Sequence, residues 1–247
     1  MRTVPLLLVV LLVGCPKQTA STTESAASQG SQVSVGEGQS EMHDRLEQLT
    51  GARDALVAGD ADGARAVMRT LSEETSPGLA PEGWQAPLQD LVEAAVTGSE
   101  ANTSEEVGAA IAEAGRACGS CHRAAGLGPY FLDVPVPAED DVMGRHVWAA
   151  DRMWESLVGA NDGAWVRARD VLGPVDERAT HLYDDVPLAV RAEAAQYRSR
   201  LHGLAEAGVT GGDSERASIY GGVLETCVGC HSLLGGGPHA EPEGDAP

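Results

Sequence analysis

The sequence predicts an all-α protein in which two tandem four-helix bundles follow a disordered tether. Alanine, leucine and glutamate are plentiful, while aromatic residues make up 4% of the chain and Phe131 is its one phenylalanine. That composition favours helices over β-sandwiches or barrels. Apolar residues recur at helical spacing in both halves. The block 42–57 also aligns without gaps on the block 143–158, as in a duplicated domain.

The amino terminus has the pattern of a bacterial export signal. Arg2 precedes the apolar stretch 4–13, which at about ten residues is too short to span a bilayer as a mature helix. The stretch runs into a Leu-Val-Gly-Cys sequence at 12–15, which resembles a lipobox. We expect removal of the signal peptide 1–14 and attachment of a diacylglyceryl group to the sulfur of Cys15. An ordinary signal peptide with an incidental cysteine is the alternative.

A flexible tether is expected over residues 15–40. Serine, threonine, glutamine and glycine dominate it, and large apolar residues are almost missing, so it cannot bury enough surface to fold. Pro16 follows the cysteine, where lipoproteins of the inner membrane typically carry aspartate. The sequence therefore predicts a protein held by its lipid anchor on the periplasmic side of the cell envelope, with the outer membrane favoured.

The first bundle is expected over residues 41–126. We expect its first three helices at 42–58, 62–74 and 87–96, each with apolar residues on one face. A fourth helix begins after Thr103, whose hydroxyl can cap the helix while Glu106 completes a capping box. Short connections between such helices favour antiparallel neighbours and hence a bundle.

The second bundle, residues 142–235, repeats this order after a linker at 127–141 that is rich in proline, glycine and acidic residues. We expect its helices at 143–159, 163–172, 187–207 and 213–231, with Asp213 capping the last one. A short tail, 236–247, completes the chain.

Each half ends in a Cys-x-x-Cys-His motif, at 118–122 and at 227–231. Two thiols three positions apart on a helix reach the two vinyl groups along one edge of a haem, and the next residue places an imidazole beneath the iron. The motifs predict two covalently bound haems c. The expected thioether attachments are Cys118, Cys121, Cys227 and Cys230, and the expected axial iron ligands are His122 and His231.

Three other uses of the four cysteines compete with haem attachment. A redox disulfide of the thioredoxin type sits in a βαβ context that this sequence lacks. A single zinc ion would have to draw together two pairs that lie far apart in the chain. Structural disulfides would suit an exported protein. Export, a helical setting and two copies at equivalent points of a repeat favour haem over all three.

A four-helix bundle with this motif near the end of its last helix resembles the class II c-type cytochromes, which are cytochrome c′ and its low-spin relatives. The resemblance covers residues 42 to about 126 and 143 to about 234, and only the Cys-x-x-Cys-His motif is specific. It implies that each haem lies in a bundle whose first helix passes over the open side of the iron. Some members place a methionine from that helix on the iron, whereas others leave the position vacant.

Candidate sixth ligands therefore lie near the start of each first helix. Met42 and Met143 hold aligned positions, and Met143 shares a helix face with His146. The position matching His146 in the first half is Arg45, and His43 is turned about 100° away from the apolar stripe. Met42 and Met143 are the first candidates, His146 follows, and His43 comes last.

Other residues are given structural roles. Three histidines without a partner motif are expected to be solvated or structural: His181, His202 and His239. Three tryptophans are expected to fill the core, with packing against a haem as the alternative: Trp148, Trp154 and Trp165. Arg123 is expected to be exposed and solvated, with pairing to a haem propionate as the alternative.

The formal charge of −20 argues against nucleic acid as a partner, because binding phosphates needs lysine and arginine. Two haems, an acidic surface and no recognisable acid–base pair predict an electron carrier, not an enzyme. Its acidic surface would meet redox partners that have basic docking faces. The alternative is a gas-binding protein of the cytochrome c′ kind, whose five-coordinate iron is open to nitric oxide or carbon monoxide. A di-haem peroxidase would need an open iron, a distal base and a high-potential partner haem, and it ranks last because the known peroxidase families have a different fold.

Overall fold

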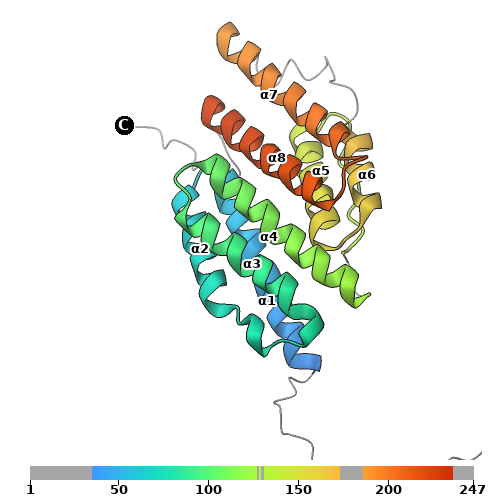
Figure 1. The fold of residues 1–247 in the computed structure, drawn as a ribbon. Coiled ribbons are helices and arrows are strands. Elements are labelled where there is room, and N and C mark those ends of the chain that lie inside the picture. Colours follow the sequence, from blue (N-terminus) through green and yellow to red (C-terminus); the bar gives the residue numbers. More distant parts are fainter. Residues whose placement is uncertain (1–34, 127, 129–130, 173–185, 236–247) are drawn as a thin grey trace, which may run out of the picture.

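The computed structural model describes residues 35–126, 128, 131–172 and 186–235. These residues form eight α-helices and one short 3₁₀ helix and contain no strand (Figure 1), which confirms the all-α class. No helix in the described ranges is long and apolar enough to cross a membrane. Several predictions lie outside those ranges: the signal peptide 1–14, lipidation at Cys15, most of the tether, the tail 236–247, His181 and His239.

The first half contains the four helices that the sequence predicts. They are α1 (Val35–Val57), α2 (Ala61–Glu74), α3 (Glu82–Glu100) and α4 (Ser104–Ala125), with η1 (Pro77–Leu79) between α2 and α3. Helix α1 begins inside the stretch expected as tether. Helix α3 begins five residues before Pro87, which lies inside it. The capping box of α4 is confirmed, since the Glu106 amide donates to Thr103 Oγ1 at 3.2 Å and the Thr103 amide donates to Glu106 Oε2 at 3.2 Å.

The second half repeats the order with α5 (Val142–Val158), α6 (Asp162–Leu172), α7 (Leu188–Ala207) and α8 (Asp213–Leu234). The prediction that Asp213 caps the last helix is wrong, because Gly212 holds the capping position and Asp213 is the first helical residue. The Asp213 carboxylate forms an ion pair with Arg123 near the end of α4 instead. Arg123 is exposed, as expected, and this ion pair is its contact with the second half.

Helices α4 and α8 lie antiparallel and side by side at the centre of the molecule (Figure 1). Glycines make the approach close, since a Cβ at Gly108 would lie 3.5 Å from the Gly221 carbonyl oxygen and one at Gly221 would lie 3.1 Å from Ala109 Cα. The ion pair between Arg123 and Asp213 joins the end of α4 to the beginning of α8. The two Cys-x-x-Cys-His motifs consequently lie at opposite ends of this helix pair.

Helices α1 and α5 also meet across the two halves. Trp154 Nε1 donates to Thr50 Oγ1 at 3.3 Å, and Arg53 Nη1 lies 2.9 Å from Asp151 Oδ1. In the repeat, which aligns residue 42 with residue 143, Thr50 corresponds to Asp151 and Arg53 corresponds to Trp154. The two contacts are thus related by an approximate twofold symmetry between the halves.

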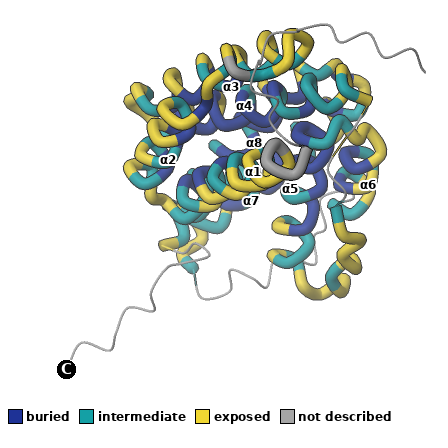
Figure 2. Tube along the Cα trace, turned by 90° about the horizontal axis from the view of Figure 1, so that it is seen from below, coloured by how far each residue is buried: buried dark blue, intermediate teal, exposed yellow. Residues whose placement is uncertain are grey.

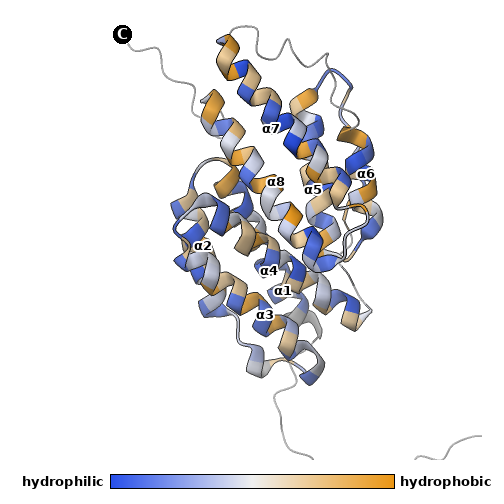
Figure 3. Ribbon diagram, turned by 45° about the horizontal axis from the view of Figure 1, so that its top comes forward, coloured by the Kyte–Doolittle hydropathy of each residue, from blue (hydrophilic) through white to orange (hydrophobic). Residues whose placement is uncertain are grey.

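One connected cluster of buried side chains contains residues of both halves. In Figure 2 the buried parts of the helices face the interior and the exposed parts face outward, and Figure 3 shows hydrophobic and hydrophilic residues interspersed along each helix. Helices α2 and α3 cover one flank of α4, while α6 and α7 lie against α5 and α8 (Figure 1). The halves 41–126 and 142–235 therefore share a core, and their division into two bundles stays a prediction.

Candidate functional site

The first Cys-x-x-Cys-His motif occupies the last turns of α4, which ends where Gly126 adopts a left-handed conformation with φ of 63°. Cys118 and Cys121 share one helix face, and both are free thiols. Burial, reinforced by the neighbouring Cys121, raises the pKa of Cys118 to about 12, and the positive charge of Arg45 opposes that rise. The middle of α1, where Arg45 lies, is therefore near the first motif.

The second motif has the same setting at the end of α8, which Gly235 terminates with φ of 68°. Burial and the nearby Cys230 raise the pKa of Cys227 to about 11, and burial raises the pKa of Cys230. Both motifs thus hold protonated thiols at neutral pH. A catalytic redox dithiol needs the opposite, a lowered cysteine pKa, so the thioredoxin-type alternative loses support.

Both motif histidines are oriented by a backbone carbonyl. His122 Nδ1 lies 2.6 Å from the carbonyl oxygen of Val158, and His231 Nδ1 lies 3.0 Å from that of Val57. A carbonyl oxygen only accepts hydrogen bonds, so Nδ1 carries the proton and donates it. In a neutral imidazole the lone pair then resides on Nε2, the atom left to bind a metal ion.

The two carbonyl groups belong to the last residues of α1 and α5, and each comes from the other half of the chain. Carbonyl groups in the last turn of a helix have no partner within that helix. The repeat aligns Val57 with Val158, each preceded by a leucine. Sequence reasoning uses these Leu-Val pairs only as markers of the repeat, and it misses the contacts that they make.

The candidate sixth ligands have unequal surroundings. Met42, about two turns into α1, is half-buried, whereas the aligned Met143 is 44% exposed. His146 is half-buried, and its ring lies edge-on to that of His202 with 6.2 Å between the centroids. Burial, followed by the charge of His202 and that of Arg198, lowers the pKa of His146 to about 4. His202 thus has a histidine partner that the sequence did not reveal.

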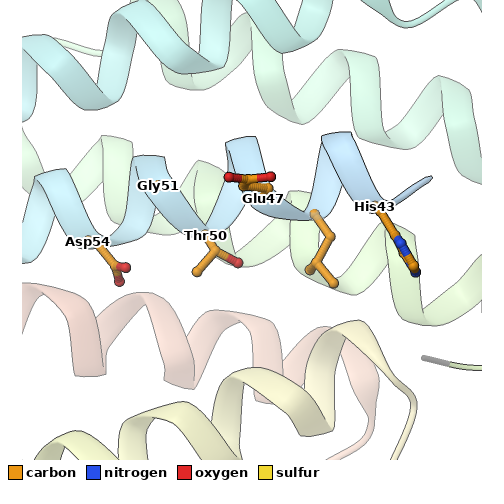
Figure 4. A pocket seen from close by; sticks show the side chains of 6 residues that line it. His43, Glu47, Thr50, Gly51 and Asp54 are labelled. Carbon is orange, nitrogen blue, oxygen red and sulfur yellow. The ribbon is translucent and has the colours of Figure 1, made fainter. Parts of the chain in front are cut away.

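A groove of about 400 Å³ runs along one face of α1 (Figure 4). Its lining residues are His43, Leu46, Glu47, Thr50, Gly51 and Asp54. Thr50 connects the groove to α5 through its bond with Trp154. His43, the last of the candidate ligands, is exposed at one end of the groove.

The three tryptophans of the second half fill the core, as expected. Trp154 stacks on Tyr220 with 5.6 Å between ring centroids and an angle of 27°. Trp165 Nε1 donates to the Ala205 carbonyl oxygen at 2.9 Å, and Trp148 Nε1 donates to that of Val134 at 2.9 Å. Trp154 also lies against Gly115, one turn before the first motif, so it packs between the two halves.

The two cysteine pairs cannot share one metal ion, because α4 and α8 hold them at opposite ends of an antiparallel pair. Within the described parts of the chain, no group of three or more histidine, cysteine, aspartate or glutamate side chains is arranged to bind a metal ion. The residues of each motif fit a haem c instead, with two thiols on one helix face and an adjacent imidazole whose Nε2 is available. A search among protein families, curated proteins and solved structures finds no match to this chain.

Proposed function

We propose that this protein is a di-haem c-type cytochrome that transfers single electrons between redox partners at the periplasmic side of the cell envelope, held there by a lipid on Cys15. One observation carries the proposal. In both Cys-x-x-Cys-His motifs the histidine Nδ1 is bonded to a carbonyl oxygen, so that Nε2 can bind iron with the ring already oriented.

The residues of each motif would hold the cofactor in distinct ways. Cys118 and Cys121 would attach the first haem through thioethers and Cys227 and Cys230 the second, while His122 and His231 would bind the two irons. A bound haem c supplies an iron that cycles between the ferric and ferrous states. The chain would contribute the covalent attachment and the orientation of the imidazoles.

In this proposal each half resembles a class II cytochrome, with the bundle α1–α4 around the first haem and α5–α8 around the second. The fourth and eighth helices would carry the haems and also form the contact between the bundles. The order of helices in the two halves and the symmetry of the contacts between α1 and α5 support this arrangement.

Unequal ligation of the two irons is part of the proposal. Met42 is half-buried on the first helix of its bundle and is the favoured sixth ligand of the first iron, while His146 is the favoured sixth ligand of the second. Met143 is the weaker candidate, since its side chain is 44% exposed. A methionine ligand raises the reduction potential, so the first haem would have the higher potential.

The acidic surface supports electron transfer between proteins. With a formal charge of −20, the protein would attract partners with basic docking faces and associate faster at low ionic strength. The expected lipid anchor and the residues that follow it would let the helical body sample the volume close to the membrane. Binding of nitric oxide or carbon monoxide remains the alternative function, and it requires an open sixth position.

The test is to mature the full chain in a host that has cytochrome c assembly machinery and to measure covalent haem and visible spectra. We expect two haems per chain, and one in the Cys118→Ala/Cys121→Ala variant. Low-spin spectra that carbon monoxide leaves unchanged are expected for an electron carrier. A high-spin spectrum that shifts with carbon monoxide would favour gas binding, and a chain without covalent haem would refute the proposal.

A further inference from the structure

We infer that each haem site is completed by the opposite half of the chain. The carbonyl group of Val158, at the end of α5, positions the iron ligand His122, and that of Val57, at the end of α1, positions His231. This inference rests on the proposed function and adds to it. It assigns positioning roles to two residues that belong to neither motif and makes each half necessary for the other half's haem.

The two carbonyl groups are available because neither is used where its helix ends. After α1, the amides of Ala58, Gly59 and Asp60 donate to the carbonyls of Asp54, Leu56 and Ala55. After α5, the amides of Gly159 and Asn161 donate to those of Glu155 and Ser156. None of these amides donates to the carbonyl group of Val57 or Val158, and each of these two carbonyls accepts from a histidine of the other half.

A helix end is a favourable acceptor for this bond. The last carbonyls of a helix carry the negative end of its dipole, so each attracts the Nδ1 proton more strongly than an isolated carbonyl does. A stronger bond at Nδ1 makes Nε2 a better electron donor to a metal ion. The ferric state of the attached haem is then stabilised, and its reduction potential falls.

The absence of a side chain at Gly119 in the first motif leaves room for the end of α5. A Cβ atom added at Gly119 would overlap the carbonyl oxygen of Leu157, the residue before Val158. Any larger residue there would have to push the end of α5 away from α4. The aligned position in the second motif is Val228, and its histidine bond to Val57 is the longer one, 3.0 Å against 2.6 Å. Glycine at 119 therefore permits the closer contact.

The arrangement gives α1 and α5 a role at both sites. Helix α1 carries Met42, the candidate ligand of the first iron, about two turns after its start and the carbonyl that holds His231 at its end. Helix α5 carries His146, the candidate ligand of the second iron, near its start and the carbonyl that holds His122 at its end. Each helix thus extends from one site to the other as a rigid connection.

The test uses the full chain with both haems attached and measures the two reduction potentials by spectroelectrochemistry. Each potential is assigned with variants that lack one cysteine pair. In Gly119→Ala the end of α5 is displaced, and we expect the first haem alone to shift to a higher potential. In Gly59→Ala, a change in the first half, a side chain at φ of +90° strains the end of α1, and we expect the second haem alone to shift upward.

Matched controls separate positioning from general destabilisation. Ser120→Ala changes the neighbouring residue of the first motif, and Gly51→Ala adds a Cβ that meets nothing within 4 Å on α1. Both are expected to leave the two potentials unchanged. Folded Gly119→Ala and Gly59→Ala proteins with two covalent haems and parental potentials would overturn the inference while the proposed function stands. So would a Gly59→Ala protein in which only the first haem shifts. A parent chain without covalent haem would instead refute the proposed function.

Discussion

Arg53 of α1 places its guanidinium among side chains of the opposite half of the chain. Its Nη1 lies 2.9 Å from Asp151 Oδ1, and its guanidinium carbon lies 5.7 Å from the centre of the Trp154 ring. The Arg53 side chain is 12% exposed, against 40% for that of Asp151. One residue of the first half thus combines an ion pair, a cation–π contact and burial at the boundary between the halves.

Removing this side chain is expected to weaken the whole fold. Arg53→Ala loses the contact with Trp154 and leaves Asp151 without its partner, although Asp151 can regain water because it is partly exposed. We expect the free energy of unfolding to fall by about 1–3 kcal/mol. Urea denaturation of the haem-loaded chain measures the loss. Arg65→Ala is the control, since Arg65 pairs with the exposed Asp62, and its effect is expected within about 0.5 kcal/mol. Equal losses in both variants would argue against a special role for Arg53.

The crossing of α4 and α8 predicts a second stability difference. In Gly221→Val the side chain would press on the backbone of Ala109, and we expect a destabilisation of about 1–3 kcal/mol from forcing the helices apart. Gly203→Ala is the contrast, because Gly203 is an exposed residue of α7 whose Cβ would meet nothing within 4 Å. It is expected to stabilise the protein by about 0.5–1 kcal/mol. Thermal unfolding followed by circular dichroism distinguishes the two, and a tolerated Gly221→Val would contradict the close crossing.

His146 predicts a loss of stability in mild acid. Its pKa falls from the usual 6.5 to about 4 in the folded chain, chiefly through burial and then through the charges of His202, Arg198 and Arg145. Between pH 6.5 and 4 the unfolded state therefore binds a proton at His146 that the folded state does not bind, and the free energy of unfolding falls as the pH drops through this window. We expect a loss on the order of 2 kcal/mol. Bonding to iron would also keep His146 neutral, so the direction is the same with haem bound.

The measurement for this prediction is the free energy of unfolding at pH 7 and at pH 4.5 for the parent chain and for His146→Leu. The leucine variant lacks the titrating group, so its decline with acidity is expected to be smaller. A decline of the same size in both proteins would mean that other groups cause the acid sensitivity.

The unequal surroundings of the two methionines predict different effects of their removal. Met42→Ala is expected to open the first iron, so that carbon monoxide changes the spectrum of about half of the haem. His146→Ala is expected to do the same at the second iron. Met143→Ala serves as the matched control, because its side chain is 44% exposed, and its spectrum is expected to match that of the parent. A carbon monoxide response in Met143→Ala alone would reverse the assignment at the second iron.

Local signals made parts of the fold predictable from the sequence. The capping box of Thr103 and Glu106 involves residues three apart, so its pattern is complete within one turn. Pro87 misled the prediction for α3, because proline is common in the first turn of a helix and here stands after that turn. Asp213 looks like a cap from its position, yet Arg123, distant in sequence, engages its carboxylate.

The sequence supports a site hypothesis only within each motif. Cys-x-x-Cys-His is a contiguous pattern, and its chemistry can be read without a fold. The partners of His122 and His231 are backbone carbonyl groups of the other half. Every residue has such a group, so no residue type in the sequence points to them. The pairing of His146 with His202 joins α5 to α7. Neither relationship follows from the periodicity of a single helix, because both depend on how the halves pack.

The antiparallel course of α4 and α8 bears on how the two redox centres would influence each other. With a rise of about 1.5 Å per residue, His122 and His231 stand about 30 Å apart along the helix pair. At that separation two unit charges interact by only about 0.5 kcal/mol at an effective dielectric constant of 20. An electron placed on one iron would hardly change the electrostatic cost of placing another on its counterpart. In the proposed di-haem cytochrome, each iron would therefore gain and lose its electron independently of the other.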